Sequence, residues 1–575
     1  MSEALRPLAA AIARAAGSLG ATLTEDEVLA ALGTPPRPEM GDVAFPTFPL
    51  ARALRNAPPR IAADLAEALR TELDDLPDVS RIEAAGPYLN AHLDPTRRAR
   101  RVIEQALDTG YGRSSDGVGR KAGIDYSSPN IAKPFGIGHL RSTVIGNALR
   151  RLHEFQGWQV TSVNHLGDWG TQFGKLMAAF ERWGDETALL DDPIQHLYRL
   201  YVDFHREIET RPELEEEGRA WFRRLEEDDP RAREYWERFR TLSLREFQRI
   251  YDRLGVSFDH FWGEAWYNGM LEPLVNEMEQ DGLLVESEGA RVVPLDDLEL
   301  PPCLIVKSDG ASLYATRDLA AARYRHDTLG TDRFLYVVGA AQSVHFQQVF
   351  AVLDRMGHTW ARGLAHVPFG MILGISTRKG TLVFLEDVLD RGRDLALEVL
   401  RTRPGLSDEE RARIADQIAV GAVVFADLSR NRMRDYEFDW DRILDWNGRT
   451  GPYLQYTHVR LGSLEQTFRE RFPGVEPGLP DDLSCLDSEH VRAILQQLER
   501  FPTIVVEATR DLEPSQVSRY LLDLAEAFNA WYSGGERLLT DDVAASAARL
   551  AVARAVRQVL GTGLGLIGVP LPDRM

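Results

Sequence analysis

The residues best placed for chemistry lie in one stretch, SSPNIAKPFGIGHLRST, at 127–143. An apolar strand near 124–127 leads into it, and Gly138 and His139 open a helix. The free N–H groups at the start of a helix, its positive dipole end and the imidazole would then face one point, which suits a polyphosphate. A purely structural turn fits these residues as well, because glycine often precedes a helix and a lone histidine is usually structural. Both interpretations stay open from this stretch alone.

The elements around the stretch predict a parallel nucleotide-binding sheet of the Rossmann type. A strand at 124–127, a helix at about 139–156 and a strand at 159–167 form the start of a βαβ unit. Sheet-like segments return at 334–340 and 367–373. The carboxyl ends of such strands lie at one edge of the sheet, where ligands bind.

The flanking patterns divide the rest of the chain. An amphipathic first helix, a second helix at about 59–72 and two strands within 81–93 predict a small α+β unit, and the Gly- and Ser-rich segment 111–123 predicts a linker. We expect an α+β N-terminal domain at 1–107, a Rossmann-type parallel-sheet domain at 108–385 with a helical insertion at about 185–255, a helical connecting region at 386–445, and an all-α helical bundle at 446–575.

One helix of the expected bundle is especially clear. Ser515 can cap it and Gly534 can end it. Its apolar stripe would consist of Val517, Leu521, Leu524, Phe528 and Trp531.

Composition limits the class of protein. The net charge of −21 argues against a protein whose whole surface binds nucleic acid, although 67 basic residues leave room for a local basic patch. Cys303 and Cys485 are too few and too far apart for a disulfide framework or a zinc ribbon, so no protein-bound metal is expected. The first twenty residues are charged at helical spacing, and no run approaches the ~20 apolar residues that span a bilayer. We therefore expect no membrane association and a cytoplasmic location.

Six sequence blocks, taken together, resemble the arginyl-tRNA synthetases, a family of class I aminoacyl-tRNA synthetases. The string PNIAKPFGIGHLRS resembles the form that the family's HIGH signature takes. The other blocks follow in family order: NHLGDWGTQFG at 164–174, YATRDLAAA at 314–322, AQSVHF at 341–346, GISTRKG at 374–380 in the place of the KMSKS loop, and TGPYLQYTHVR at 450–460. The resemblance covers essentially the whole chain, including its final PDRM, and the chain is identified as a member of this family.

The resemblance implies both an activity and an architecture. The activity is ATP-dependent activation of L-arginine to arginyl-adenylate and transfer of arginine to the 3′-terminal adenosine of tRNA(Arg), with Mg²⁺ brought by the nucleotide. The architecture is a Rossmann-type catalytic domain, an N-terminal domain that contacts the tRNA elbow, and a helical anticodon-binding domain. Family members require bound tRNA for the first step, and we expect the chain to act as a monomer.

The resemblance also implies the roles of particular residues. The catalytic set is His139, Lys133, Arg378 and Lys379. The ATP-binding set is Pro134, Gly136, Gly138, His139, Asp168, Gly170, Gln172, Ser376 and Thr377. The arginine-binding set is Asn130, Glu264, Tyr314, Asp318 and Gln342. The tRNA-binding set is Asn90, Tyr453, Gln455, Tyr456 and Arg460.

The arginine-binding set also makes chemical sense. A guanidinium carries five donors and keeps its charge, so it needs carboxylates and planar acceptors around it. Glu264 and Asp318 are expected to hold the guanidinium, Tyr314 to line the pocket, and Asn130 and Gln342 to fix the substrate's amino and polar groups. Considered singly, each has a plainer interpretation, since an acid is usually a solvated surface charge and a tyrosine is usually half-buried core.

The chain departs from the family pattern at three places. Gly136 replaces the first histidine of the HIGH signature, and loss of one donor to developing phosphate charge costs about 2.7 to 4 kcal/mol elsewhere. Thr377 replaces the second lysine of KMSKS, and family members that lack this lysine carry one just before the first signature, here Lys133. Compensation by Lys133, helped by Arg378 or Lys379, is our hypothesis. Arg449 stands where an acid is expected, and nothing in the sequence explains it.

Two other functions remain as alternatives. Gly136 suggests a synthetase-like paralogue with weakened catalysis, acting as a tRNA-binding protein or in a specialised pathway. Against this, decay would also be expected to erode the substrate pocket, whose residues are all retained. A small-molecule nucleotidyltransferase is disfavoured, because such an enzyme has no use for the helices that begin at 450–460.

Overall fold

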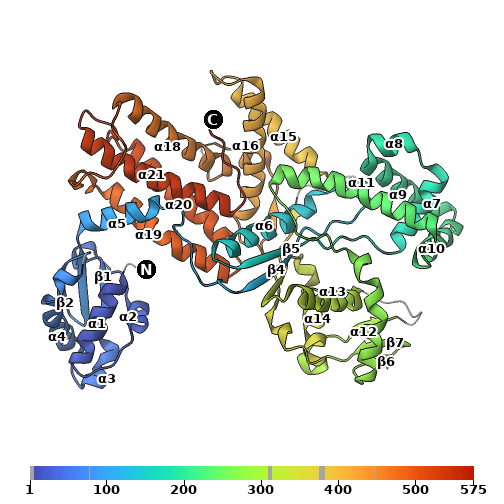
Figure 1. Ribbon diagram of the computed structural model, residues 1–575, viewed down its shortest axis with the longest axis horizontal. Coiled ribbons are helices and arrows are strands. Elements are labelled where there is room, and N and C mark those ends of the chain that lie inside the picture. The colour runs from blue at the N-terminus through green and yellow to red at the C-terminus, as the bar shows by residue number, and fades with distance from the viewer. Residues whose placement is uncertain (1–4, 77, 308–313, 374–382, 447) are drawn as a thin grey trace. The chain divides into compact units, whose positions relative to one another are not determined.

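The computed structural model describes residues 5–76, 78–307, 314–373, 383–446 and 448–575 (Figure 1). The chain folds into two compact units. The first unit comprises Met1–Arg113, Tyr456–Glu507 and Arg519–Gly563, and the second comprises Ser114–Gln455, Ala508–Ser518 and Leu564–Met575. The four expected domains have different bounds from these units, and that division stays a prediction.

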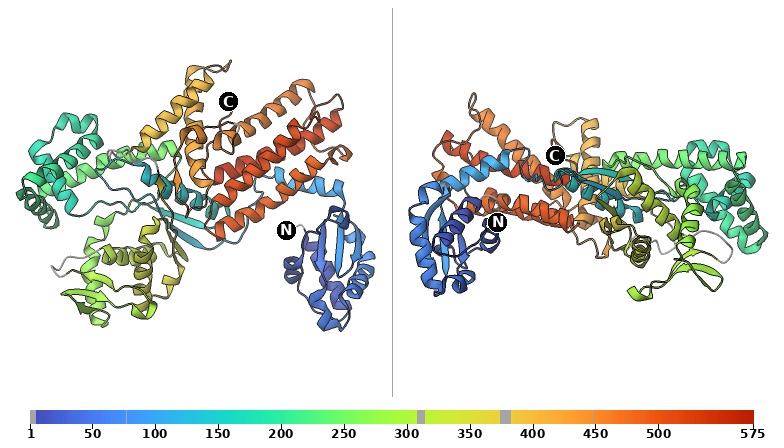
Figure 2. Two further views of the ribbon diagram at one scale, coloured as in Figure 1. Left: turned by 180° about the vertical axis from the view of Figure 1, so that it is seen from behind. Right: turned by 60° about the horizontal axis from the view of Figure 1, so that its bottom comes forward.

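The centre of the second unit is a four-stranded parallel sheet, which confirms the predicted Rossmann-type fold. Its strand order is β10 (Leu364–His366), β9 (Arg333–Tyr336), β4 (Lys121–Asp125) and β5 (Gln159–Val163). Helix α6 (Leu140–Phe155) connects β4 to β5 and lies beside them (Figures 1 and 2). In the register of the sheet, Asp125 stands level with Val163 and Tyr336, so the segments that follow these three residues meet at one edge.

The predicted elements of this sheet are confirmed, but their bounds differ. The strand expected at 124–127 is Lys121–Asp125, the strand expected at 159–167 ends at Val163, and the strand in the segment 334–340 ends at Tyr336. The strand expected at 367–373 is wrong: β10 precedes this segment, and β11 (Ile372–Leu373) pairs with β12 (Tyr436–Glu437) outside the parallel sheet. Pro368 has no N–H to donate to a ladder, which explains why the chain leaves the sheet there.

A group of helices fills the predicted insertion. They are α7 (Thr171–Trp183), α8 (Glu186–Asp191), α9 (Pro193–Thr210), α10 (Glu213–Glu226) and α11 (Pro230–Leu254). Asp192 and Asp229 cap α9 and α11, each followed by proline at the first helical position, and Gly255 ends α11 with a φ of 65°. These local signals set the helix ends. Figure 1 shows α7 to α10 as one cluster.

A small antiparallel sheet, which the sequence analysis did not predict, follows α12 (Asn268–Gln280). It consists of β6 (Val285–Ser287), β7 (Ala290–Val293) and β8 (Cys303–Val306). Together with α13 (Tyr314–Leu329) and α14 (Ser343–Arg355) it encloses a hydrophobic core. These strands are too short to give a clear alternating pattern, which explains why they were missed.

Three further helices complete the middle of the second unit. They are α15 (Leu385–Leu400), α16 (Asp408–Leu428) and the short α17 (Trp440–Ile443). Helix α16 begins with a capping box, in which Ser407 and Glu410 satisfy each other's backbone N–H groups. Its last turns are buried on every side and are apolar except at Asp427, so α16 is a core helix.

The first unit begins with the predicted α+β domain. Its helices are α1 (Arg6–Ser18), α2 (Glu25–Ala31), α3 (Ala51–Leu54) and α4 (Pro58–Arg70). They pack against an antiparallel sheet in which β3 (Tyr88–Leu93) lies between β1 (Val43–Pro46) and β2 (Val79–Ala85). Helix α5 (Pro95–Leu107) follows directly.

The rest of the first unit is a helical bundle. It contains α19 (Glu489–Arg510), α20 (Ser515–Ser533), α21 (Val543–Leu566) and most of α18 (Gly451–Arg471). The clear helix predicted from the sequence is confirmed as α20. It ends just before Gly534, and its whole predicted apolar stripe is buried. Ser515, expected to cap it, is its first helical residue.

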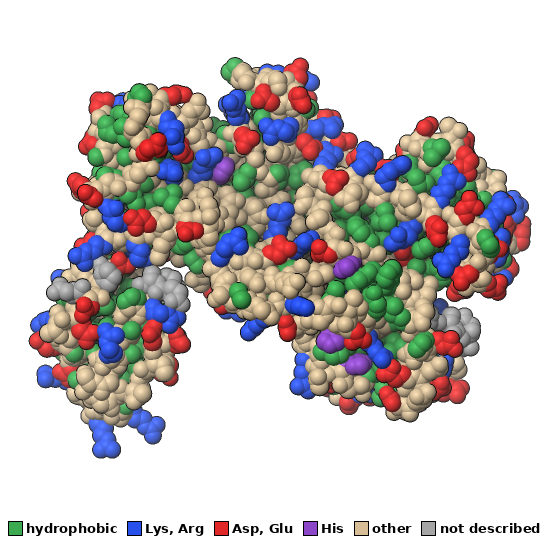
Figure 3. Space-filling view, in the orientation of Figure 1, with side chains coloured by type: hydrophobic (Ala, Val, Ile, Leu, Met, Phe, Trp, Pro, Cys, Tyr) green, Lys and Arg blue, Asp and Glu red, His purple; other side chains and the backbone are tan. Residues whose placement is uncertain are grey.

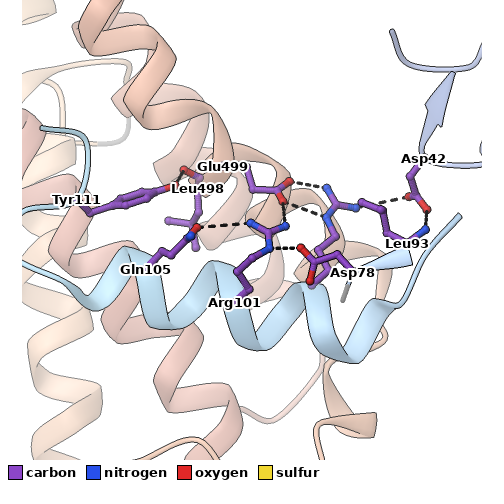
Figure 4. A network of polar contacts seen from close by, with 9 residues as sticks. Asp42, Asp78, Leu93, Arg101, Gln105, Tyr111, Leu498 and Glu499 are labelled. Carbon is purple, nitrogen blue, oxygen red and sulfur yellow. Dashed lines mark hydrogen bonds and ion pairs between the residues drawn. The ribbon is translucent and has the colours of Figure 1, made fainter. Parts of the chain in front are cut away.

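Charged side chains join the α+β domain to the bundle within the first unit (Figure 4). Glu499 of α19 accepts hydrogen bonds from Arg98 (2.6 Å) and Arg101 (3.0 Å), both on α5. Arg98 also reaches Asp42, and Arg101 donates to Asp78, next to β2. One acid on the bundle thus holds two arginines that also contact the small domain.

Candidate functional site

The segment after β4 has an unusual backbone. Ser127, Ser128 and Ala132 have φ values of 74°, 48° and 58°, in the left-handed region that L-residues rarely adopt. Side chains of two helices hold this conformation. Ser142 of α6 accepts from the N–H of Ser127 (2.9 Å), and Ser243 of α11 accepts from the N–H of Ala132 (2.8 Å). The turn is therefore strained locally and fixed from both sides.

Asn130 lies where this turn meets the turn after β5. The N–H of Ile131 donates to the carbonyl of Gly167, and the N–H of Gly167 donates to the carbonyl of Pro129, both at 3.1 Å. A Cβ on Gly167 would come within 2.0 Å of the Asn130 Oδ1 atom. Only glycine at 167 leaves space for the Asn130 amide.

His139 ends a short 3₁₀ turn, Ile137–His139, that leads into α6. Its ring lies 5.2 Å from that of Phe135, and its Nδ1 atom is buried with no hydrogen-bond partner among the described residues. Burial, with a contribution from the charge of Lys133, lowers the pKa of His139, so the imidazole is neutral at pH 7. Of the neighbouring predicted residues, Gly138 is exposed and Pro134 is buried.

Lys133 lies between the turn and the insertion. Its Nζ atom is 5.0 Å from the ring centroid of Tyr201 on α9, and burial lowers its pKa. No ion pair of Lys133 occurs within the described ranges. Its ammonium group therefore has no protein counter-charge there.

The turn at Gly136 pairs with a distant segment. The N–H of Ile137 donates to the carbonyl of Val383 (3.1 Å), and the N–H of Leu385 donates to the carbonyl of Phe135 (2.9 Å). The predicted ATP-binding and catalytic residues just before this segment lie outside the described residues; they are Ser376, Thr377, Arg378 and Lys379. These two hydrogen bonds place the segment that begins at Val383 against the turn at Gly136.

Asp168 follows β5, and its side chain is turned into the protein. It accepts from the N–H of Ala265 (2.9 Å) and from Arg240 (3.2 Å), and burial raises its pKa. It thereby ties the turn to the segment that carries Glu264. Of the other two predicted nucleotide contacts on this turn, Gly170 has a φ of 125° just before α7, and Gln172 is half-buried in the first turn of α7.

The two carboxylates expected to hold a guanidinium lie within electrostatic range of each other. Glu264 opens the 3₁₀ turn Glu264–Tyr267, and Asp318 is in the second turn of α13. Burial, together with the charges of Asp168 and Asp318, raises the pKa of Glu264 to about 7, although Arg317 opposes this. Burial would also raise the pKa of Asp318, but a 2.6 Å hydrogen bond with His345 and further charges lower it. The site thus contains one carboxylate that is ionised, Asp318, and one whose pKa is close to 7, Glu264.

The other predicted arginine ligands are more open. Tyr314 starts α13, one helical turn before Asp318 on the same face, and its side chain is 71% exposed. Gln342 is exposed just before α14. Both are free to approach a ligand.

A cavity of about 1090 Å³ adjoins this region within the second unit. Gly263 and Ala265, which flank Glu264, line it, as does Arg317, which precedes Asp318. Its walls also carry three indole rings, those of Trp169, Trp236 and Trp266. The carboxylates of Glu264 and Asp318 are not among its lining residues, so we regard the cavity as a neighbour of the site and not as the arginine pocket.

The predicted tRNA-binding residues fall into two groups. Tyr453, Tyr456 and Arg460 are half-buried on α18, and the Arg460 guanidinium lies over the Tyr456 and Tyr532 rings at 4.7 and 5.0 Å. Gln455 differs from expectation, because its side chain is fully buried and donates to the carbonyls of Gln417 (3.0 Å) and Pro570 (2.7 Å). The amide of Gln455 therefore makes hydrogen bonds within the second unit and does not face solvent.

Asn90 is also buried, with 1% of its surface exposed, on β3. Its Oδ1 atom has no hydrogen-bond partner among the described residues. Like Gln455, Asn90 differs from expectation, because a side chain this deeply buried is not presented to a tRNA.

Sequence reasoning missed several charged residues that organise the site. Asp125, at the end of β4, pairs with Arg325 of α13, and Arg141 of α6 pairs with Asp427 of α16. A charged residue in an otherwise apolar strand or core helix was the available signal. This signal could not identify the partner, because in each case the partner lies on another helix that is far away in the sequence.

The described residues contain neither a cluster of metal-ligating side chains nor a membrane-spanning helix. No group of three or more His, Cys, Asp or Glu side chains there could hold a metal ion. None of the helices that the structure describes is long and apolar enough to cross a membrane.

Comparison with protein families covers almost the whole chain. The model of the tRNA synthetases class I (R), catalytic domain, matches residues 103–440. The DALR anticodon binding domain matches 454–575, and the arginyl tRNA synthetase N terminal domain matches 6–93.

Individual proteins agree with these matches. The chain is 45% identical to an arginine–tRNA ligase of Clostridium perfringens, over 94% of this chain and 95% of that protein. It is 46% identical to arginine–tRNA ligase 1 of Bacillus cereus, over 96% and 97%. The fold is similar to that of arginyl-tRNA synthetase from Plasmodium falciparum (TM-score 0.77, 21% identity, covering 99% and 98%) and from Thermus thermophilus (0.76, 24%, covering 99% and 100%).

Proposed function

The chain belongs to the arginyl-tRNA synthetase family, and we propose that it is an arginine–tRNA ligase that charges tRNA(Arg) for translation in the cytoplasm, as a monomer. The observation that carries this proposal is the pair of carboxylates, Glu264 and Asp318, beside the turn after β5. The N–H of Glu264 donates to the carbonyl of Leu166 (2.9 Å), Asp318 lies 4.0 Å from His165, and the same turn pairs with the strained turn after β4 at Gly167 and Asn130. An ionised acid and a second acid poised to ionise suit a guanidinium, whose charge is permanent.

The reaction has two steps. A carboxylate oxygen of arginine attacks the α-phosphorus of ATP in line, the bond to the bridging oxygen breaks, and pyrophosphate leaves. A ribose hydroxyl at the 3′ end of tRNA then attacks the carbonyl carbon of arginyl-adenylate, and AMP leaves. In both steps the protein mainly positions the reactants and neutralises charge.

The turn and the start of α6 would bind the triphosphate. Neutral His139 and the N–H groups at Gly138 can donate to phosphate oxygens, and the positive end of α6 favours their charge. Mg²⁺ would be held by the phosphates themselves and would neutralise charge there.

The substrate pocket divides its tasks. We assign the guanidinium to Glu264 and Asp318, with Tyr314 on its face. Asn130, held between two turns, and exposed Gln342 would contact the amino and carboxyl end of arginine, next to the nucleotide.

For tRNA, we assign the anticodon loop to Tyr456 and Arg460 of α18, since aromatic rings and guanidinium groups stack on unpaired bases. Tyr453 belongs to the same proposal. The N-terminal domain would contact the tRNA elbow, although the Asn90 side chain is buried and is not presented at the surface of that domain. Buried Gln455 would then support the helix and not contact a base.

A paralogue without catalysis is not favoured. The relatives align over nearly the whole chain, and the proposed arginine ligands are all present in this sequence. Gly136 has a φ of −78° and a ψ of 162°, which any residue adopts, so the backbone does not require glycine there.

ATP–pyrophosphate exchange with and without arginine and tRNA tests the proposal. We expect arginine-dependent exchange in the natural chain and faster exchange, by about tenfold or more, in Gly136→His, because one phosphate donor is restored. Charging of tRNA should follow the same order. Absence of arginine-dependent exchange from both proteins would favour the tRNA-binding paralogue.

Lys133→Ala tests the compensation hypothesis in the same assay. A cation that offsets the missing signature lysine should be needed, so we expect exchange to fall by at least tenfold while the melting temperature is unchanged. Lys133→Arg, which keeps the charge, is the matched control. Exchange that survives Lys133→Ala intact would reject the hypothesis.

A further inference from the structure

The carboxylate of Asp318 lies between two imidazoles from different elements. His345 of α14 approaches Oδ2 at 2.6 Å, and the Nε2 atom of His165, which follows β5, lies 4.0 Å from Oδ1. His345 is thus within hydrogen-bond distance of the carboxylate, whereas His165 faces its other oxygen from beyond hydrogen-bond distance. Asp318 is held by His345 on one side and has the polar edge of the His165 ring on the other.

A buried arginine stands behind His165. Arg325 is 1% exposed and lies on α13, two helical turns after Asp318 on the same face. It donates to Asp125 Oδ2 (2.8 Å), to the hydroxyl of Tyr267 (3.1 Å) and to His165 Nδ1 (2.9 Å). Every arm of its guanidinium has a partner.

Aromatic rings fix Arg325 further. Its guanidinium carbon lies 5.6, 5.4 and 5.7 Å from the ring centroids of Tyr267, Phe334 and Tyr336. Such contacts are strongest when the cation is out of water. The cation is therefore held rigidly at the end of the central strands.

The partners of Arg325 determine the tautomer of His165. The Nδ1 atom of His165 lies 2.9 Å from Arg325 and 3.1 Å from the carbonyl of Trp262. A guanidinium is always charged and can only donate, and an N–H on Nδ1 would point at that cation. The closer, charged contact therefore favours Nδ1 as an acceptor and places the ring proton on Nε2. Nε2 is the atom that faces Asp318. Burial and the charge of Arg325 lower the pKa of His165, so the ring stays neutral and keeps this single proton.

We propose that Arg325 and His165 are positioning residues for the substrate amino acid: Asp125, Arg325 and His165 form a buried relay that orients the Asp318 carboxylate toward the guanidinium of arginine. This inference rests on the proposed function and on the assignment of Asp318 to the guanidinium. Neither Arg325 nor His165 needs to touch the substrate. Arg325 would thus help to orient Asp318, the acid that binds the substrate arginine.

A pair of His165 variants separates the two hydrogen-bonding ends of the ring. His165→Gln places an amide N–H near the Nε2 position, and His165→Asn places an acceptor near Nδ1 but no donor toward Asp318. The Nε2 atom faces Asp318 at 4.0 Å, beyond hydrogen-bond distance, so we expect His165→Asn to raise the KM for arginine about threefold, less than loss of a hydrogen bond to a charged group would. His165→Gln should keep a KM close to that of the natural chain. The KM for ATP and the melting temperature should not change in either.

Tyr267→Phe is a second route to the same test, should the His165 variants fold poorly. It removes one acceptor from Arg325 and leaves Asp318 and His345 untouched. We expect the KM for arginine to rise about threefold. A rise in the KM for ATP of the same size, or equal values for His165→Asn and His165→Gln, would overturn the relay.

Two controls separate this inference from the proposed function. If the natural chain does not charge tRNA with arginine, the function itself fails. If it does, and Asp318→Asn leaves the KM for arginine unchanged, the assignment of Asp318 fails before the relay is tested. If the function and the assignment of Asp318 both hold, the His165 and Tyr267 variants test the relay itself.

Discussion

Glu264 and Asp318, the two carboxylates proposed to bind one guanidinium, have pKa values that are shifted in opposite directions. Burial is the largest influence on each, but Asp318 is held ionised mainly by His345, whereas Glu264 has the charges of Asp168 and Asp318 nearby. An empty pocket with two full negative charges would be unfavourable, and partial protonation of Glu264 relieves this. The arriving guanidinium would then displace a proton.

Arginine binding should therefore depend on pH through Glu264. In the free site its pKa is about 7, and a bound guanidinium lowers it, so binding releases a proton below pH 7. The KM for arginine should rise as pH falls from 8 to 6, while the KM for ATP changes less. Glu264→Gln should raise the KM at pH 8 and remove the trend. A KM for arginine that is flat over this range in the natural chain would contradict the assignment.

Gly167 offers a test of Asn130 without changing Asn130. A Cβ at 167 would come within 2.0 Å of the Asn130 Oδ1 atom, so Gly167→Ala should displace that side chain. We expect the KM for arginine to rise at least tenfold. The control is Gly269→Ala, where a Cβ meets nothing within 4 Å. Equal kinetics for the two variants would argue against a role for Asn130.

At the scale of elements, the helix that carries the signature is fixed by a buried ion pair. Arg141 of α6 and Asp427 of α16 are each 1% exposed and lie 3.0 Å apart. Arg141 also donates to the carbonyl of Arg434 (2.9 Å) and lies over the rings of Phe369 and Tyr436. The pair joins the catalytic sheet to the helices that follow it.

Removing one partner of this pair should be strongly destabilising, since it leaves a buried charge alone. We expect Asp427→Ala to lower the free energy of unfolding by about 3 to 5 kcal/mol. Urea denaturation measures the loss. Arg223→Ala, which breaks the exposed pair with Glu216, should cost less than about 1 kcal/mol. The double variant Arg141→Leu/Asp427→Leu should lose less than Asp427→Ala alone.

At the scale of the molecule, basic and acidic side chains alternate on the face shown in Figure 3, and neither sign forms a continuous field there. Long-range attraction over that face is then not a sufficient basis for tRNA binding. In the first unit, the bundle and the small domain are instead joined by the Glu499 network, so that two proposed tRNA-binding parts are held together (Figure 4).

Glu499→Ala should loosen this connection. It removes the acceptor shared by Arg98 and Arg101, and we expect the KM for tRNA to rise about fivefold, as for loss of one net hydrogen bond to a charged group. The KM for arginine should not change. Glu507→Ala removes an acid of the same helix that lies outside this network and is the control. Identical values for both variants would show that the network does not serve tRNA binding.

The sequence by itself determined the family and most local structure. Blocks such as 127–143 and 314–322 keep their order and spacing along the chain, and helix ends at Asp229 and Gly255 follow from neighbouring residues. The apolar stripe of α20 was likewise readable, because a period of 3.6 residues needs no distant partner. Short strands such as β6 carried no such period.

Only the tertiary structure decided which charges are buried and with whom. Arg325 and Asp125 are 200 residues apart, and Arg141 and Arg434 are 293 apart, so no local pattern links them. The same holds for Gln455, an expected base contact that the fold uses for its own interior. Burial and partners set proton affinity and orientation, and both arise from contacts between distant segments. The reactive groups could therefore be identified from the sequence, whereas their protonation states and orientations depend on the tertiary structure.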